Sequence, residues 1–338
     1  MKAVVYAEYG ALPDVRDVPE PKCPPAGAVL AVRATGVCRS DWHAWQGHDP
    51  VALPNIPGHE LAGEVVEVGP TVTGWRPGAR VTVPFVCGCG TCPYCLAGDA
   101  QVCPHQTQPG FTGPGSFAER VAIEAADVNL VALPDSVDFV TAASLGCRFA
   151  TAFRALTAHG RLAAGEWLAV HGCGGVGLSA VQIGVALGAR VVAVDVSAPA
   201  RARAAELGAV VVETPTAIPD VTGGGAHVSV DAVGSPDTAV ASVSCLRRRG
   251  RHVQVGLLLG DSARPPLPMD LVVAHELSIH GSHGMAAGDY PPLLALVADG
   301  TLRPDLLVGT RISLDQAGAA LAAMDRPAAA GMTVVELP

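Results

Sequence analysis

A glycine-rich turn between two apolar segments constrains the fold of this chain more than any other feature. Residues 166–195 read EWLAVHGCGGVGLSAVQIGVALGARVVAVD. The pattern predicts a short buried strand at 166–171, then an apolar helix, then a second strand at 191–194. The motif glycines, spaced G-x-G-x-x-G, are Gly172, Gly174 and Gly177. This spacing occurs by chance in many proteins, but between a strand and a helix it is typical of a dinucleotide-binding turn.

The backbone of this turn and one carboxylate predict which dinucleotide binds. Glycines allow close backbone approach, and the helix N-terminus at Gly175 and Val176 is expected to hold a pyrophosphate. Asp195 follows the second strand, where a carboxylate accepts hydrogen bonds from ribose hydroxyls and repels a 2′-phosphate. NAD is therefore expected as the cofactor rather than NADP. NADP stays an alternative because Arg201 and Arg203 are nearby in the sequence.

The rest of the chain divides by its pattern. After Asp195, apolar strand-like runs alternate with helical ones up to about residue 283, which predicts a doubly wound parallel sheet. The first 145 residues instead carry short β-branched runs separated by Pro and Gly, typical of an antiparallel β domain. We expect one domain from 1–148 and 284–338, and a dinucleotide-binding domain at 149–283.

Composition narrows the function classes. The chain has 338 residues, with 49% hydrophobic residues and a net charge of −9, which argues against a nucleic-acid partner. The one basic run, Arg247 to Arg251, is interpreted as a solvated helix end. The N-terminus lacks an apolar signal region, and the most apolar stretch is interrupted by Gln182 and Arg190. A cytoplasmic protein without a membrane partner is expected.

Half of the ten cysteines lie within residues 86–103. Four of them have the spacing C-x2-C-x2-C-x7-C, and they are Cys89, Cys92, Cys95 and Cys103. Disulfides are disfavoured in a reducing cytoplasm, so a metal site is the better interpretation. Four thiolates suit Zn²⁺ in a closed, structural site, and an iron–sulfur cluster remains the alternative. Cys87 lies outside the pattern.

A second set of metal-ligand residues is dispersed. Cys38 and His59 flank a loop rich in Pro and Gly, and Cys147 begins a predicted helix. A lone Cys or His is more often a packed core residue, so these positions are weak evidence by themselves. Glu60 follows His59, but no second histidine stands at the spacing of a zinc-protease helix, which excludes that class.

Four motifs together carry a resemblance that none carries alone. They are GVCRSD, GHELAGEVVEVGPTV, the four-cysteine segment, and GCGGVG with Asp195. With them in this order, the chain resembles the zinc-containing alcohol dehydrogenases of the medium-chain dehydrogenase/reductase family along essentially its full length. The resemblance implies an α/β protein with a GroES-like β-rich catalytic domain and a Rossmann domain. It further implies reversible oxidation of an alcohol to an aldehyde or ketone, in a homo-oligomer such as a dimer or tetramer.

The resemblance also implies a role for each matching residue. Cys38, His59 and Cys147 would hold a catalytic zinc, a Lewis acid toward the alcohol. The cysteine segment would hold a second, structural zinc.

Five further residues would act around this zinc. Ser40 would take the proton of the alcohol and pass it through the nicotinamide ribose to His43. Asp41 would orient the histidine ligand. Glu60 lies behind the zinc, and Arg39 would contact the cofactor pyrophosphate.

The substrate pocket is the least determined part. The resemblance places Asp49, Phe85 and Phe111 in the pocket, with Leu257 at its cofactor side. Relatives usually have a large apolar residue in place of Asp49, so a polar or cationic alcohol would follow if Asp49 faces the pocket. Met332 stands where many relatives carry a basic residue for the pyrophosphate.

Three functions remain open at this stage. The first is a zinc- and NAD-dependent alcohol dehydrogenase acting on a small alcohol. The second is a polyol or amino-alcohol dehydrogenase on the same scaffold, against which Cys147 weighs because polyol relatives commonly have a carboxylate there. The third is a catalytically silent dinucleotide-binding protein, which the full set of site residues argues against.

Overall fold

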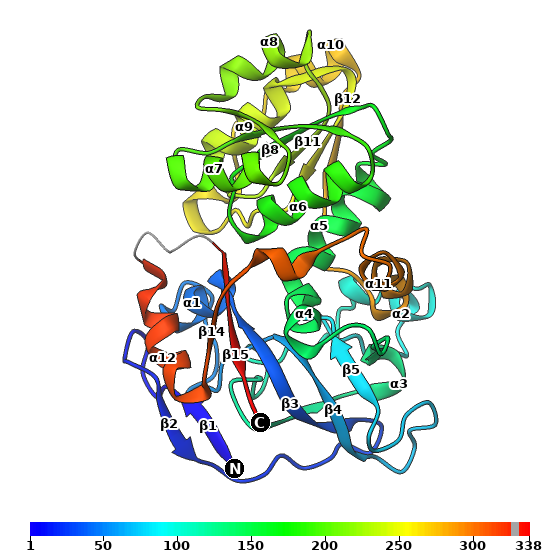
Figure 1. The fold of residues 1–338 in the computed structure, drawn as a ribbon, viewed down its shortest axis with the longest axis vertical. Coiled ribbons are helices and arrows are strands. Elements are labelled where there is room, and N and C mark those ends of the chain that lie inside the picture. Colours follow the sequence, from blue (N-terminus) through cyan, green and yellow to red (C-terminus); the bar gives the residue numbers. More distant parts are fainter. Residues whose placement is uncertain (326–330) are drawn as a thin grey trace. The chain divides into compact units, whose positions relative to one another are not determined.

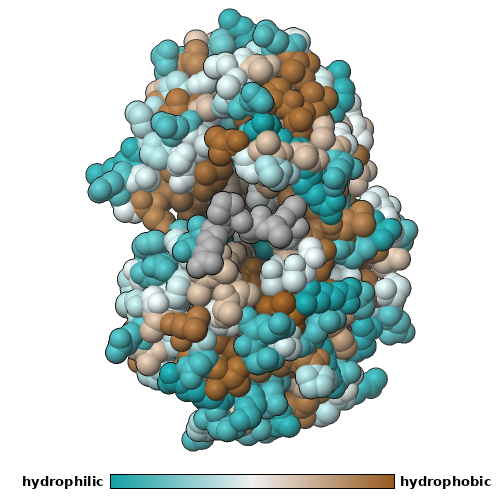
Figure 2. Space-filling view, turned by 60° about the vertical axis from the view of Figure 1, so that its left-hand side comes forward, coloured by the Kyte–Doolittle hydropathy of each residue, from teal (hydrophilic) through white to brown (hydrophobic). Residues whose placement is uncertain are grey.

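The computed structural model describes residues 1–325 and 331–338. The chain divides into two compact units, Met1–Ala150 with Gly284–Pro338, and Thr151–His283. Among the described helices, none is long and apolar enough to cross a membrane. On the face drawn in Figure 2, hydrophobic side chains are interspersed with hydrophilic ones.

The first unit is built on a mainly antiparallel sheet in the order β14-β15-β3-β4-β5-β7, with β6 paired to β3 (Figure 1). Its strands are β1 (Lys2–Val5), β2 (Asp14–Asp17), β3 (Ala28–Val37), β4 (Glu60–Val68), β5 (Arg80–Val83), β6 (Arg120–Ile123), β7 (Val131–Ala132), β14 (Val308–Ile312) and β15 (Met332–Glu336). Its helices are α1 (Arg39–Trp45), α2 (Pro93–Leu96), α3 (Ala126–Asn129), α4 (Phe139–Ala143), α11 (Tyr290–Ala298) and α12 (Leu314–Ala322). Buried β-branched and leucine side chains of β3 to β6 form the core, and α4 packs on β3 and β4.

The second unit is a parallel sheet in the order β10-β9-β8-β11-β12-β13 (Figure 1). Its strands are β8 (Trp167–His171), β9 (Arg190–Val194), β10 (Val210–Val212), β11 (Ala226–Asp231), β12 (Leu246–Gln254) and β13 (Ser278–Gly281). Its helices are α6 (Gly175–Ala186), α7 (Ala198–Glu206), α8 (Ile218–Thr222), α9 (Pro236–Ser244) and α10 (Met269–His275), and α5 (Ala150–Arg154) leads into it. The expected doubly wound sheet is confirmed, because the order reverses between β8 and β11 as in nucleotide-binding folds.

The structure corrects the interpretation of the basic run as a helix end. Helix α9 ends at Ser244, and Arg247, Arg248, Arg249 and Arg251 lie in strand β12 rather than at a helix end. Strand β12 pairs with β11 at Leu246 and again from Arg251 to Gln254, with a register shift between these two parts. Arg249 sits in the irregular stretch with φ +61°. The basic run therefore lies in the irregular first half of a strand that pairs with β11 on either side of most of the run.

Candidate metal centres and cofactor site

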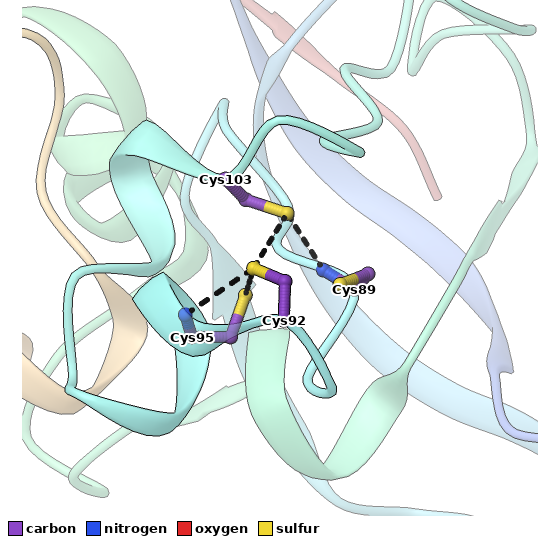
Figure 3. A group of neighbouring side chains, drawn as sticks. All are labelled: Cys89, Cys92, Cys95 and Cys103. Atoms are coloured by element: carbon purple, nitrogen blue, oxygen red, sulfur yellow. Dashed lines mark hydrogen bonds between the residues drawn. The ribbon is translucent and has the colours of Figure 1, made fainter.

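The four cysteines of residues 89–103 converge on one point (Figure 3). Helix α2 begins after Cys92, whose Sγ accepts the backbone N–H of Cys95 at 3.5 Å. Cys103 Sγ likewise accepts the backbone N–H of Cys89 at 3.4 Å and that of His105 at 3.3 Å. The loop thus supplies backbone donors to two sulfurs, which suits thiolates.

The sulfur spacing fits a single zinc ion. Cys92 Sγ lies 3.5 Å from Cys95 Sγ and 3.7 Å from Cys103 Sγ. A tetrahedron with zinc–sulfur bonds of about 2.3 Å has edges of about 3.8 Å. A multi-iron cluster needs room for several atoms between its thiolates, so the single-ion interpretation holds. Cys87 is separate and inert, since burial raises the pKa of its thiol to about 12.

Sheet register brings the first two dispersed residues together. Cys38 directly follows β3, and His59 directly precedes β4. Strands β3 and β4 are antiparallel, with Gly36 paired to Glu60. The end of one strand therefore lies beside the start of the other, and the residues just beyond them meet.

Cys147 reaches the same place from another element. It sits in a π-helical turn, Leu145–Phe149, between α4 and α5, and not at the start of a regular helix as expected. The turn packs on the start of β4, and Gly146 O accepts a hydrogen bond from Phe85 N at 3.3 Å and from the buried Tyr290 hydroxyl at 3.3 Å. Such π-turns often present a side chain at a functional site.

The described residues form a second potential metal group, made of Cys38, His59, Glu60 and Cys147. Their ligand atoms all lie within 4.8 Å of one another. His59 Nδ1 donates to Asp41 Oδ1 at 2.8 Å, and among the described residues the buried His59 Nε2 has no hydrogen-bond partner. An unpartnered imidazole nitrogen beside two buried thiols fits a zinc ion.

The two thiols are electrostatically coupled. A hydrogen bond from Cys147 lowers the pKa of Cys38 well below its usual value, and the same bond raises the pKa of Cys147. The positive charge of Arg148 further favours the Cys38 thiolate. Zinc binding would deprotonate both thiols, because only thiolates act as ligands.

The sequence analysis did not identify Arg148, which forms a buried ion pair with Glu60. Arg148 Nε donates to Glu60 Oε1 at 2.9 Å, and its terminal nitrogen donates to Oε2. The Glu60 side chain is fully buried, and that of Arg148 is 10% exposed. An arginine inside the apolar run AASLGCRFATAF was the available signal, because buried arginines need a partner.

Ser40 and His43 both lie on α1, the helix that follows Cys38. Ser40 Oγ lies 3.9 Å from Cys38 Sγ. His43 is half-buried, and its Nδ1 lies 3.2 Å from Nδ1 of the exposed His48. Burial, with His48 and Arg39 as cationic neighbours, lowers the pKa of His43. A neutral imidazole at pH 7 can accept a proton.

Aromatic rings flank the histidine of this group. The ring centroid of His59 lies 5.3 Å from that of Phe111 and 6.1 Å from that of Phe85, both edge-on. Asp49 is exposed. It lies two residues after Gly47, where the turn that follows α1 ends. Two aromatic rings therefore lie beside the His59 ring, in addition to its polar neighbours.

In the second unit, the glycine turn joins β8 to α6 as predicted. Gly172 has φ +90°, which favours glycine. A Cβ on Gly177 would lie 1.8 Å from Gly172 O, so the helix and the turn can pack this closely only without a side chain. A Cβ on Gly174 would meet nothing within 4 Å, which leaves open space above the turn.

Asp195 follows β9 and is fixed on both oxygens. Its Oδ2 accepts the backbone N–H of Cys173 at 2.7 Å, and its Oδ1 accepts that of Ser197 at 2.7 Å. Arg201 pairs with Glu213 at 3.0 Å and also donates to Asp195 O. Arg203 pairs with Glu206. Both arginines are thus engaged by carboxylates.

Three remaining positions carry less structural information. Arg39 is exposed, with its guanidinium 4.9 Å from the Trp42 ring centroid. Leu257 is 52% exposed in the loop after β12. Met332 is buried at the start of β15. The predicted cofactor contacts of Arg39 and Leu257 stay predictions, as does the alignment of Met332 with the basic residue of relatives.

Comparisons with known proteins agree with this architecture. Residues 24–135 match the alcohol dehydrogenase GroES-like domain, and residues 175–299 match the zinc-binding dehydrogenase domain. An alcohol dehydrogenase of Geobacillus stearothermophilus is 35% identical over 90% of both chains. A sorbitol dehydrogenase of Halalkalibacterium halodurans is 33% identical over 91% of both chains.

Similarity to solved structures extends over the whole chain. The alcohol dehydrogenase TADH from Thermus sp. ATN1 has a TM-score of 0.92 and 30% identity, covering 100% of both chains. Its match confirms the expected GroES-like and Rossmann-type folds. The chain therefore belongs to the zinc-containing alcohol dehydrogenases of the medium-chain dehydrogenase/reductase family, and it is an enzyme that uses zinc and a nicotinamide cofactor.

Proposed function

We propose that this enzyme reversibly oxidises a small primary or secondary alcohol to an aldehyde or ketone, with NAD as the hydride acceptor. The observation that carries the proposal is the convergence of Cys38, His59 and Cys147 around the unpartnered His59 Nε2. Three ligands leave one position of a tetrahedral zinc open, as catalytic sites require. A bound Zn²⁺ would supply a Lewis acid that polarises the alcohol oxygen.

The other residues hold the site or move a proton. Asp41 keeps the Nδ1 proton on His59, so that Nε2 faces the metal position. Ser40 is the nearest hydroxyl to Cys38 Sγ on α1 and would accept the alcohol proton. His43, kept neutral by its lowered pKa, would receive that proton, and the exposed His48 beside it would release it to water.

Asp195 supports NAD as the cofactor. Its carboxylate is fixed by two backbone N–H groups, so a 2′-phosphate placed at this strand end would meet a negative charge that cannot turn away. Arg201 and Arg203 would have to leave Glu213 and Glu206 to offset that charge. The cofactor would lie at the carboxyl end of the sheet, where the strand order reverses.

A polyol dehydrogenase is the second candidate, favoured by the match to sorbitol dehydrogenase. Against it, the apolar rings of Phe85 and Phe111 lie edge-on beside His59, and Asp49 is exposed. Apolar walls suit a small alcohol better than a polyol, which needs hydrogen-bond partners.

The experiment that tests the proposal uses zinc-loaded, purified enzyme. A panel of simple alcohols, polyols and amino alcohols is assayed for NADH formation, together with zinc content per chain. Two zinc ions and turnover of simple alcohols support the proposal. Turnover restricted to polyols favours the second candidate, and no hydride transfer with any alcohol overturns both.

A further inference from the structure

We propose that Arg148 is a positioning residue of the catalytic metal site, and that it holds the Glu60 carboxylate away from the metal so that the fourth position stays open. The inference rests on the proposed function only through the presence of a metal at Cys38, His59 and Cys147.

Glu60 is close enough to compete for the metal. One of its carboxylate oxygens belongs to the group of ligand atoms that lie within 4.8 Å of one another. A carboxylate is a common zinc ligand, and four protein ligands make a closed, structural site. The chain therefore contains a fourth potential ligand at a place where catalysis needs an open position.

Arg148 occupies both oxygens of that carboxylate. Its side chain makes two parallel hydrogen bonds, and the Arg148 backbone N–H adds a third to Oε1 at 3.3 Å. Such a bidentate pair fixes orientation as well as charge. Because Arg148 follows Cys147 directly, one turn carries both a metal ligand and the group that restrains its competitor.

The surrounding backbone is shaped to admit the pair. A Cβ on Gly36 of β3 would lie 2.3 Å from Glu60 Oε2 and 3.1 Å from an Arg148 terminal nitrogen. The pair fills the space that a side chain at this strand position would take. Glycine at position 36 therefore leaves the space in which the Glu60 carboxylate faces the Arg148 guanidinium.

Charge balance favours the same arrangement. Two thiolates neutralise a divalent ion, and the guanidinium neutralises the Glu60 carboxylate. Without Arg148, the metal would be the cation next to the buried carboxylate, because His59 is neutral when its proton is on Nδ1 and its Nε2 faces the metal. It would then bind the metal or take up a proton.

The test uses full-length protein with cobalt(II) at the catalytic site. Zinc is retained in the cysteine lobe, the segment that carries Cys89, Cys92, Cys95 and Cys103. Imidazole is the probe for the open position, followed by the visible cobalt spectrum. For Arg148→Met we expect imidazole to bind at least about tenfold more weakly, and cobalt to be released more slowly to EDTA, because Glu60 becomes a ligand. If Arg148 only stabilised the local structure, the Arg148→Met variant would instead release cobalt faster than the wild-type protein.

Two variants complete the design. Arg148→Met combined with Glu60→Leu should recover wild-type imidazole binding, because the competing ligand is gone. Arg251→Met, which breaks the Arg251–Glu166 pair in the other unit, should change neither readout.

The outcomes separate the two proposals. Unchanged imidazole binding in Arg148→Met, faster cobalt release, or no recovery in the double variant overturns the inference. If Arg148→Met does not fold, Arg148→Lys replaces it, because lysine keeps the charge but loses the two parallel hydrogen bonds. Weaker imidazole binding in Arg148→Lys supports the inference, and unchanged binding overturns it. Failure of the wild-type protein to bind cobalt at this site overturns the proposed function as well.

Discussion

The carboxylate of Asp41 connects its own helix to His59, because Oδ1 accepts the His59 Nδ1–H at 2.8 Å. Its other oxygen accepts the backbone N–H of Cys38 at 3.1 Å. One buried carboxylate thus joins two of the three proposed ligand segments.

Asp41→Asn should weaken zinc binding at the catalytic site without affecting the cysteine lobe. The amide keeps the shape but removes the charge that favours the Nδ1 proton, and loss of such partners lowers metal affinity by about 10–100-fold. Chelator competition, resolving the two zinc ions, measures the effect. Asp49→Asn, at an exposed position, is the control. Equal zinc retention in both variants would contradict the assigned role.

Replacing one cysteine in each metal group should give opposite phenotypes. Cys38→Ala should abolish turnover while the melting temperature and NAD binding stay close to wild type, because the ligand set is dispersed over a folded sheet. Cys92→Ala should lower the melting temperature or cause aggregation, because it removes a metal that is coupled to folding. Thermal unfolding, zinc content and NADH formation separate the two. Loss of activity alone in both variants would refute the division into two kinds of site.

The pH dependence of alcohol oxidation should report His43. Its pKa is lowered by burial and by cationic neighbours, so the acid limb of kcat/KM should lie below the ordinary histidine value of about 6.5. His43→Gln should remove that limb and slow turnover by as much as about 10²-fold. His48→Gln removes a like charge and should move the limb to higher pH. His275→Gln is the control, and an unshifted limb in His48→Gln would contradict the pairing.

Cofactor preference should depend on the charge of Asp195. Asp195→Asn removes the charge but keeps an acceptor for the turn, and should raise the ratio of kcat/KM for NADP over NAD by about tenfold, which corresponds to about 1.4 kcal/mol. Asp195→Gly should raise the same ratio but also loosen the backbone at Cys173 and Ser197, which is visible as a lower melting temperature. If neither ratio changes, Asp195 does not select the cofactor.

Two glycines of the cofactor turn should respond differently to alanine. Gly177→Ala places a Cβ 1.8 Å from Gly172 O and should destabilise the second unit. Gly174→Ala points into open space and should leave the melting temperature unchanged while it weakens NAD binding. Thermal unfolding and NAD titration make the comparison. Unchanged NAD affinity in Gly174→Ala would place the pyrophosphate elsewhere.

Local patterns predicted the second unit well. The glycine turn, its strand and its helix are neighbours in sequence, so periodicity and spacing were sufficient to predict a parallel sheet. The interpretation of the basic run as a helix end was wrong because Leu246 and Arg251, on either side of most of the run, pair with β11, which the polar local sequence does not reveal.

The catalytic group was harder to predict because its geometry depends on contacts between distant segments. Motif resemblance indicated Cys38, His59 and Cys147, but periodicity could not have brought them together. Arg148 was missed for a related reason: its burial makes sense only with Glu60, which stands 88 positions earlier in the chain. The π-helical turn that presents Cys147 also has no distinct hydrophobic pattern.

The contrast between the two cysteine groups has a consequence for biosynthesis. The ligands of the lobe lie within one short loop, so closing it around a metal costs little chain entropy. The catalytic ligands come from three segments and converge only after β3, β4 and the π-helical turn have packed. During translation, the lobe can capture zinc as soon as Cys103 leaves the ribosome, before Cys147 has been made. The ligand set of the lobe is therefore complete in the nascent chain before that of the catalytic group.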